Sequence, residues 1–238
     1  MGKKRNTYIP ALRFRGLTRF YDPVLRAVLK EERLKRILVK QVHAEPGHRI
    51  LDLGCGTATL SVMLKQAYPG ATVVGLDIDP EVLAIARRKA ALANCEIEFH
   101  QGLAYDPGDG LRFRSGSFDC VVSSLLFHHL TADDKRRTFE KVWELLKPGG
   151  ELLIVDWGKA QNPLMRVAFL GVQLLDGFST TSDNVQGRLP ALMRDAGLAK
   201  VEETHREMSL FGTLSFYRAV KEGGAQPPAP GISNRIES

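Results

Sequence analysis

Short apolar runs alternate with segments of helical periodicity between Arg49 and Asp156, and this alternation restricts the fold more than any other feature of the sequence. Apolar runs that predict strands lie at residues 49–53, 71–76, 96–100, 118–123 and 151–156. Apolar residues at three- and four-residue spacing predict helices at residues 57–68, 80–92 and 133–146. Because nearly continuous apolar strands are buried on both faces, the pattern predicts an α/β fold with a parallel sheet between two helical layers.

The flanking segments extend this unit into one domain over residues 17–221. Residues 1–16 predict a flexible basic arm, and Asp22-Pro23 predicts the start of a helical entry region within residues 17–45. Lys147-Pro148-Gly149-Gly150 predicts a tight turn. An apolar segment, a helix and two final strand-like runs follow, at residues 160–180, 185–196, 200–206 and 213–220. The Gly-, Pro- and Ser-rich tail at 222–238 predicts disorder.

The basic character of the chain belongs to its N-terminal part. Residues 1–40 hold 12 Lys or Arg and three acids, whereas the whole chain has a net charge of +6. A basic arm of this kind contacts nucleic acid or an anionic lipid surface, or it is a solvated tail. The sequence leaves these alternatives open.

Cysteine usage and apolar run lengths predict the compartment. The three cysteines, Cys55, Cys95 and Cys120, form no CxxC pair, so neither a disulfide framework nor a metal site is expected. The sequence also predicts no secretory signal and no membrane span. We therefore expect a cytoplasmic protein in a reducing compartment.

The strongest functional signal is ILDLGCGTATL at residues 50–60, where a predicted strand enters a glycine-rich turn that opens a helix. Gly54 and Gly56 lack a Cβ atom, so the backbone there bends sharply and approaches a ligand closely. A helix N-terminus also offers N–H groups to an anionic group. An ordinary strand-to-helix turn is the alternative interpretation.

A carboxylate follows the next predicted strand. Asp77 lies 21 positions after Gly56 and is placed to accept both hydroxyl hydrogens of a ribose. Asp79 is better placed than Asp77 to cap the helix that begins at Pro80. The two signals together predict a nucleoside-containing ligand. A dinucleotide fingerprint would need a third glycine where Thr59 stands, so NAD and FAD are disfavoured.

Four blocks in this order resemble the class I S-adenosylmethionine-dependent methyltransferases. They are LDLGCGTAT, VVGLDID, SFDCVVSSLLFHHL and LLKPGGELLIVDW, within residues 45–157. The resemblance is nearest to the small-molecule branch similar to the ubiquinone and menaquinone biosynthesis enzymes. It implies a Rossmann-like, mostly parallel seven-stranded sheet with helices on both faces and an antiparallel last strand, and it implies S-adenosylmethionine as the cofactor.

The resemblance also implies a role for each matching residue. Asp77 would take the ribose hydroxyls, Ile78 would pack on the adenine, and Leu103 and Ala104 would lie at the adenine edge, where the family usually has an Asp before a small residue. Ala58 replaces a usual glycine, which is tolerable if the residue is already helical. The residues expected at the methionine end of the cofactor, or covering it, are Tyr21, Asp52, Gly54, Cys55, Gly56, Thr57, Ser123 and Ser124.

Three residues are candidates for chemistry on the methyl acceptor. His128 and His129 follow the fourth predicted strand, and histidine titrates near neutral pH, so either could accept a proton. Asp156 ends the fifth predicted strand and is a candidate base or substrate anchor. The structural alternatives are backbone-bonded histidines and a loop cap. The segments at 17–45 and 160–180 are candidate lids over the carboxyl ends of the strands.

Three functions remain in competition. The first is methyl transfer to a small-molecule acceptor, possibly a hydrophobic one, with peripheral membrane contact through the basic arm. The second is methylation of RNA or another nucleic acid, although no strong nucleic-acid motif follows the fourth predicted strand. The third is a module that binds S-adenosylmethionine without catalysis.

Overall fold

A computed structural model describes residues 31–107, 113–159, 183–184, 186–209 and 212–224. Tyr21, the arm at 1–16, the helix start at Asp22-Pro23, the apolar segment at 160–180 and most of the tail lie outside these residues. The predictions made for them therefore stay predictions.

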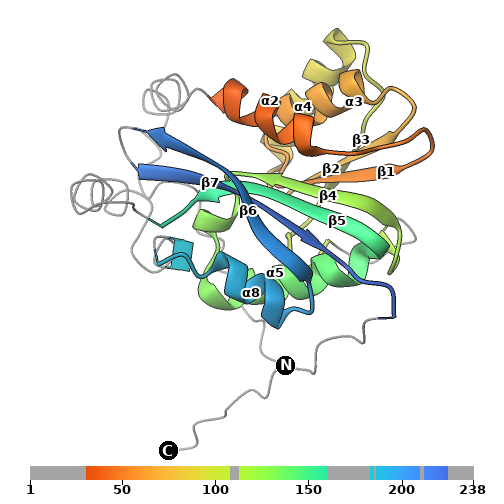
Figure 1. The fold of residues 1–238 in the computed structure, drawn as a ribbon. Coiled ribbons are helices and arrows are strands. Elements are labelled where there is room, and N and C mark those ends of the chain that lie inside the picture. Colours follow the sequence, from red (N-terminus) through yellow and green to blue (C-terminus); the bar gives the residue numbers. More distant parts are fainter. Residues whose placement is uncertain (1–30, 108–112, 160–182, 185, 210–211, 225–238) are drawn as a thin grey trace, which may run out of the picture.

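A seven-stranded sheet forms the centre of the molecule, in the order β3-β2-β1-β4-β5-β7-β6 (Figure 1). Strands β1 to β5 pair in parallel, and β7 is antiparallel to both β5 and β6. The predicted Rossmann-like sheet with an antiparallel last strand is therefore confirmed. The strands are β1 (Arg49–Leu53), β2 (Thr72–Asp77), β3 (Glu98–Gln101), β4 (Phe118–Ser124), β5 (Leu146–Trp157), β6 (Ala199–Ser209) and β7 (Gly212–Val220).

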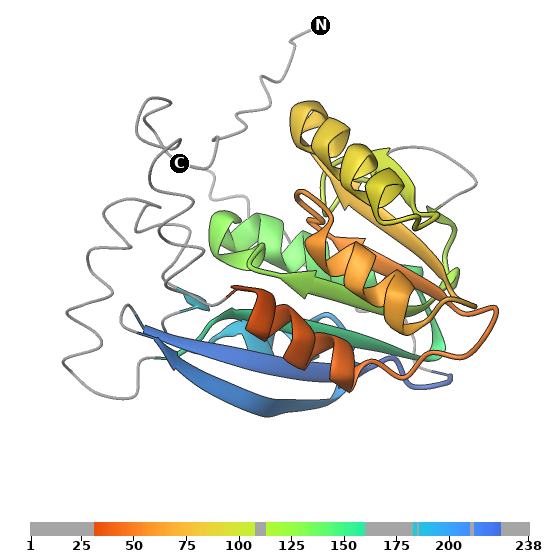
Figure 2. The same ribbon diagram turned by 90° about the horizontal axis from the view of Figure 1, so that it is seen from above.

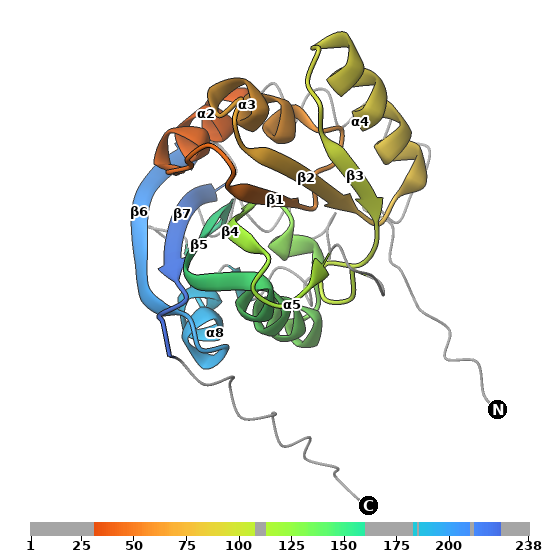
Figure 3. The ribbon, with the colours of Figure 1, turned by 90° about the vertical axis from the view of Figure 1, so that its right-hand side faces the viewer.

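Helices cover both faces of the sheet (Figures 2 and 3). One layer holds α2 (Glu31–Gln41), α3 (Thr59–Ala67) and α4 (Pro80–Leu92), and the other holds α5 (Ala132–Leu145) and α8 (Leu189–Asp195). The short 3₁₀ helix η2 (Phe127–His129) follows β4. Successive strand residues alternate between two cores, because side chains of a strand point to opposite faces. Ile50 packs with α2 and α3, whereas Leu51 packs with α5 and α8.

The boundary between α3 and its preceding turn differs from prediction. The helix begins at Thr59 rather than at 57, because Ala58 has a left-handed conformation with φ 62°. Ala58 was expected to be tolerable if its backbone were already helical, and its backbone is not helical. A left-handed conformation costs a non-glycine residue roughly 1–2 kcal/mol. The prediction for α4 is confirmed at both ends, and Asp79 caps it by accepting the N–H groups of Glu81 and Val82.

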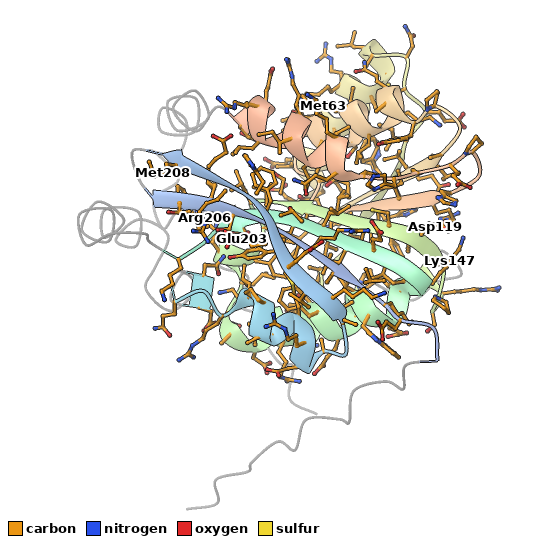
Figure 4. The ribbon with its side chains drawn as sticks, in the orientation of Figure 1. Met63, Asp119, Lys147, Glu203, Arg206 and Met208 are labelled. Atoms are coloured by element: carbon orange, nitrogen blue, oxygen red, sulfur yellow. The ribbon has the colours of Figure 1, made fainter. Side chains whose placement is uncertain are left out.

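The predicted tight turn at residues 147–150 is wrong. These residues belong to the long strand β5, whose pairing with β4 changes register between Phe118 and Cys120. Gly149 has φ 83°, and its N–H donates to the Lys221 carbonyl at 2.7 Å, so the irregularity is absorbed inside the sheet. Lys147 donates to both carboxylate oxygens of Asp119 at 2.7 and 2.8 Å (Figure 4). This ion pair lies at the amino ends of β4 and β5, away from the site described next.

Candidate active site

The turn after β1 is bonded to the end of β2 by three successive N–H groups. Those of Gly54 and Cys55 donate to the Leu76 carbonyl at 2.8 and 3.0 Å, and that of Gly56 donates to Asp77 Oδ2 at 2.8 Å. Gly54 and Gly56 have φ of 72° and 53°, a region that favours glycine. The conformation of the turn is thus held by the protein itself.

The two glycines of this turn face different surroundings. A Cβ atom on Gly54 would lie 2.9 Å from Leu126 Cδ1, whereas one on Gly56 would have no heavy atom within 4 Å. Gly54 is therefore needed for close packing against the segment after β4. Gly56 borders open space in which a ligand can approach the backbone.

Asp77 ends β2 beside this open space. Its carboxylate accepts the Gly56 N–H on Oδ2 and the Asp79 N–H at 3.0 Å on Oδ1. A carboxylate has about four lone-pair sites, so two acceptor positions remain for the hydroxyls of a ligand. The structure therefore places the predicted ribose acceptor directly against the glycine turn.

Backbone and amide contacts bring the predicted adenine-side residues to the same edge. Gly102 donates to the Asp77 carbonyl at 3.0 Å, and the Gln101 side chain donates to the Ile78 carbonyl at 3.1 Å. Leu103 is held in a tight turn by two backbone hydrogen bonds with Asp106, each of 3.1 Å. Ile78, Leu103 and the neighbouring Ala104 are half-buried and adjoin the end of β2.

Asp52 is a buried acid under the same turn. Ser61 Oγ donates to Asp52 Oδ2 at 2.5 Å, and Asp77 lies close enough to interact with it electrostatically. Burial is the main cause that raises the pKa of Asp52 to about 6, and the Ser61 hydrogen bond and the Lys35 ammonium oppose that rise. Two carboxylates, one buried and one half-buried, thus lie on the strand ends that flank the turn.

Other predicted cofactor residues use their side chains within the protein. The Cys55 thiol is buried, which raises its pKa, and it lies under β2, where a Cβ on Gly75 would be 3.0 Å from the sulfur. Ser123 Oγ donates to the Leu53 carbonyl at 2.8 Å. By contrast, Ser124 Oγ is buried and has no hydrogen-bond partner among the described residues.

Lys89 of α4 supports the turn, a role that the sequence pattern did not indicate. Its ammonium donates to Thr57 Oγ1 at 3.0 Å and to Thr59 Oγ1 at 2.8 Å, on either side of the left-handed Ala58. Lys89 is partly buried between α4 and the turn, because its long stem packs while its charge reaches the hydroxyls.

The three residues proposed for chemistry meet at the carboxyl ends of β4 and β5. His128 is buried, and its Nδ1 lies 2.9 Å from Asp156 Oδ1. The His128 and His129 ring centroids are 3.9 Å apart. Crowding of the ring by the surrounding protein, together with the neighbouring His128, lowers the pKa of His129, although the residue keeps an exposed surface.

Asp156 accepts four hydrogen bonds, although its side chain is fully buried. The donors are Phe127 N at 2.7 Å, Trp157 N at 2.7 Å, His128 Nδ1 and Asn184 Nδ2 at 3.0 Å. Burial alone would raise the pKa of Asp156, but the contact with His128 and the Trp157 N–H bond outweigh burial and lower it. Asp156 is therefore ionised at pH 7, but its lowered pKa makes it a weak base and four protein donors already occupy its oxygens, which favours an orienting role over the predicted role as a base.

A buried ion pair extends this cluster toward α5. Lys135 is 0% exposed, and its ammonium lies 3.6 Å from Asp183 Oδ2. Burial lowers the pKa of Lys135, while Asp183 and Asp156 act in the opposite direction. Arg188 also lies 3.6 Å from Asp183, on its other oxygen. The cluster thus contains charges of both signs in a water-poor region.

Sequence reasoning missed Lys135, Asp183 and Asn184. Lys135 did give a signal, because it lies four residues before Phe139 and so occupies the inward face of α5, where a lysine is unusual. Asp183 and Asn184 are ordinary loop residues by sequence. Only their contacts in the folded chain distinguish them.

A family model described as "Methyltransferase domain" matches residues 50–150. The demethylmenaquinone methyltransferase of Clavibacter sepedonicus is 31% identical over 206 residues, which cover 79% of each chain. The enzyme of the same name from Thermus thermophilus is 39% identical over 109 residues, which cover 46% of this chain and 47% of that relative. The chain thus spans about half the length of the Thermus protein.

The fold has solved counterparts. The apo crystal structure of SibL, an S-adenosylmethionine-dependent methyltransferase, superposes with a TM-score of 0.67 at 21% identity and covers 88% of this chain and 60% of SibL. At this identity the likeness concerns the fold. Among the described residues, no helix has both the length and the apolar character that a membrane crossing requires.

Proposed function

This chain belongs to the class I S-adenosylmethionine-dependent methyltransferases, and from that premise we propose that it transfers the methyl group of this cofactor to a small-molecule acceptor. One observation carries the proposal. The Gly54–Gly56 turn is held against Asp77 with open space beside Gly56, so a backbone cradle and a ribose-binding carboxylate adjoin each other.

The residues present fit the cofactor. Asp77 keeps two acceptor positions for the ribose, and Ile78, Leu103 and Ala104 offer half-buried apolar surface for the adenine. Asp52 supplies negative charge near the turn for the ammonium group of the methionine portion. Ser124 Oγ at the end of β4, which has no partner among the described residues, offers a further polar contact. When bound, S-adenosylmethionine supplies an electrophilic methyl group on a positively charged sulfur.

We propose a phenolic or quinol-type aromatic acceptor. The relatives from Clavibacter and Thermus are named for demethylmenaquinone, and the carboxyl ends of β4 and β5 carry the His128–Asp156 pair. A hydroxyl-bearing aromatic ring suits a site that offers a proton acceptor.

The protein residues orient the acceptor, exclude water and receive its proton. His128 is the proton acceptor in this proposal: Asp156 fixes its Nδ1 as the donor nitrogen, which leaves the Nε2 lone pair to take a proton from the acceptor. His129, which is exposed beside His128, is the second candidate, and its lowered pKa makes it the weaker base. Asp77 and the glycine turn hold the donor side, so donor and acceptor meet across the ends of β1 and β4.

Calorimetry with S-adenosylhomocysteine and with NAD tests the cofactor. We expect binding of the first and none of the second, and the reverse result would contradict the proposal. Transfer of a labelled methyl group to lipid and aqueous extracts, assayed separately, tests the acceptor. Label in a small lipid-soluble product supports the proposal, whereas label in RNA supports the nucleic-acid alternative. Binding without any transfer supports a non-catalytic module.

We further propose that the protein acts in the cytoplasm and touches membranes peripherally through its basic N-terminal part. The 12 Lys or Arg of residues 1–40 would attract anionic headgroups, beside which a hydrophobic acceptor resides. Cosedimentation with vesicles of phosphatidylglycerol, compared with vesicles of phosphatidylcholine, measures this contact. Equal recovery on both vesicles would contradict it.

A further inference from the structure

Asn184 is buried beside the proposed proton acceptor and has no role in the function proposed above. Its side chain is 0% exposed, and its amide nitrogen donates to Asp156 Oδ1 at 3.0 Å. Its other amide atom, Oδ1, is buried and has no hydrogen-bond partner among the described residues. A buried acceptor without a donor is costly, and such groups in native proteins call for an explanation. Among the described residues, the side-chain amide of Asn184 thus has one hydrogen bond, the one to Asp156.

The orientation of the Asn184 amide is determined by that contact. If the amide were rotated by 180°, its oxygen would face the ionised Asp156 carboxylate, and two acceptors would oppose each other. Asp156 therefore receives a donor from Asn184 on the same oxygen that bonds His128 Nδ1. This oxygen also accepts Trp157 N at 2.7 Å, while Phe127 N occupies the other oxygen. The carboxylate can rotate little without losing one of these bonds.

The segment that carries Asn184 is itself fixed to α5. Asp183 lies 3.6 Å from the buried Lys135 ammonium, and the Asp183 carbonyl accepts Arg188 N at 2.8 Å. The Asn184 carbonyl accepts Gly187 N at 3.0 Å. Two backbone bonds and one ion pair therefore hold the amide at the distance that Asp156 requires.

We propose that Asn184 is a positioning residue for His128, which it serves through Asp156. The amide holds the carboxylate in the rotamer that accepts His128 Nδ1–H, so that the Nε2 lone pair is the one presented to the methyl acceptor. This role rests on the proposed function, because it explains what keeps the proposed proton acceptor, His128, in one tautomer. No bond is made or broken by Asn184.

The charged and titratable groups around His128, Asp156 and Asn184 come from four elements. His129 adjoins His128 in η2, Lys135 faces Asp156 from α5, and Tyr217 of β7 interacts electrostatically with Asp156. Asp183 balances Lys135 from the segment before α8. The titration of these groups therefore contributes, together with that of His128, to any pH profile of the enzyme's activity.

Nitrogen-15 NMR of the histidine side chains tests the proposal without turnover. In the wild-type protein bound to S-adenosylhomocysteine, we expect neutral His128 as the single Nδ1–H tautomer, with its signals assigned by their loss in His128→Gln. Asn184→Leu removes the donor at similar volume, so a second tautomer should appear. If Asn184→Leu does not fold, Asn184→Ser serves as the second variant, because its side chain is too short to reach Asp156 in the same way.

Activity provides the second measurement. Because general base catalysis contributes about 10²–10⁴-fold, partial misorientation of His128 should lower kcat roughly tenfold. The affinity for S-adenosylhomocysteine should stay within about twofold, because Asn184 makes no contact with the glycine turn or Asp77. Thr138→Val is the matched control: it removes a buried hydroxyl of α5 that donates to the Asp134 carbonyl at 2.6 Å, and it should change neither the tautomer nor kcat.

The outcomes distinguish the positioning role of Asn184 from the proposed methyl transfer. An unchanged His128 tautomer in both Asn184 variants would overturn the positioning role. A mixed tautomer in the wild-type protein would overturn it too. A wild-type protein with the expected tautomer and a tautomer change in Asn184→Leu, but without methyl transfer to any acceptor, would support the positioning role and overturn the proposed function.

Discussion

The two halves of the candidate site are built in opposite ways. At the ends of β1 and β2, backbone N–H groups and one half-buried carboxylate form the site, and the residues involved are close in sequence or on adjacent strands. At the ends of β4 and β5, buried charged side chains form it, and they come from η2, α5, β5 and the segment before α8. The first half depends on backbone conformation, and the second depends on mutual charge compensation.

This difference predicts how each half fails. Loss of the Asp77 side chain removes ligand contacts but leaves the sheet intact, because the Leu76 carbonyl also accepts hydrogen bonds from the glycine turn. Loss of one charge from the buried cluster leaves its partners uncompensated in a region of low dielectric constant. Ligand affinity should therefore be the sensitive quantity in the first half, and folding stability in the second.

The largest effect should follow from Asp156→Ala. The substitution deprives four donors of their acceptor and leaves the cluster with unbalanced positive charge, so the free energy of unfolding should fall by about 3–5 kcal/mol. Urea denaturation measures this loss. A loss below about 1 kcal/mol would mean that the cluster is hydrated in solution and that the proposed contrast between the halves is wrong.

Asp77→Ala should act on binding instead. The variant loses the proposed ribose acceptor and the partner of Gly56 N–H, and S-adenosylhomocysteine should bind on the order of 100-fold more weakly, about 3 kcal/mol. Isothermal calorimetry measures the change. Asp79→Ala is the control, because it removes only the cap of α4 and should cost about 1 kcal/mol of stability with affinity unchanged. Unchanged affinity in Asp77→Ala contradicts the ribose assignment.

Among the described residues of the first half, Asp52 is a buried acid, and its pH dependence tests the contrast between the two halves. Because its pKa is about 6 in the folded protein, above the ordinary value of 3.8, the folded state binds more protons between these values, and stability falls as pH rises through this window. An Asn amide carries no charge, so it avoids the cost of burying an ionised carboxylate. Asp52→Asn should therefore gain about 2–3 kcal/mol of stability at pH 7, less any loss of the Ser61 bond.

The same substitution should weaken cofactor binding, because the ammonium group of the cofactor favours an ionised Asp52. In the wild-type protein the affinity for S-adenosylhomocysteine should therefore increase as pH rises through about 6, and in Asp52→Asn this increase should be absent. Calorimetry and urea denaturation at pH 5 and pH 7.5 measure both slopes. Parallel pH profiles in the two proteins would exclude Asp52 as the responsible group.

The smallest effect concerns Ala58. Ala58→Gly relieves the left-handed strain but adds freedom to the unfolded chain and removes a buried methyl group, so a net gain of only about 0.5–1 kcal/mol is expected. Thermal denaturation measures it. Ala67→Gly, at the C-terminal end of α3, should instead destabilise the protein, because glycine there has no strain to relieve. A loss of stability in Ala58→Gly as large as that in Ala67→Gly would contradict the strain assigned to Ala58.

The sequence by itself determined the layered α/β fold and the first half of the site. The alternation of apolar runs with helical periodicity placed the strands between two helical layers, and the paired glycines with Asp77 marked the ligand end, because these properties follow from local spacing. Sequence reasoning did not foresee the left-handed Ala58 or the continuous strand through residues 147–150, since each depends on packing against neighbouring strands and helices.

Only the tertiary structure decided the second half. His128 and Asp156 could be named as candidates from their places after strands, but the roles of Lys135, Asp183 and Asn184 follow from contacts across elements distant in sequence. The physical reason is that a buried charge is stabilised by whichever partners the fold brings within a few ångströms, and that set is a property of the packed chain.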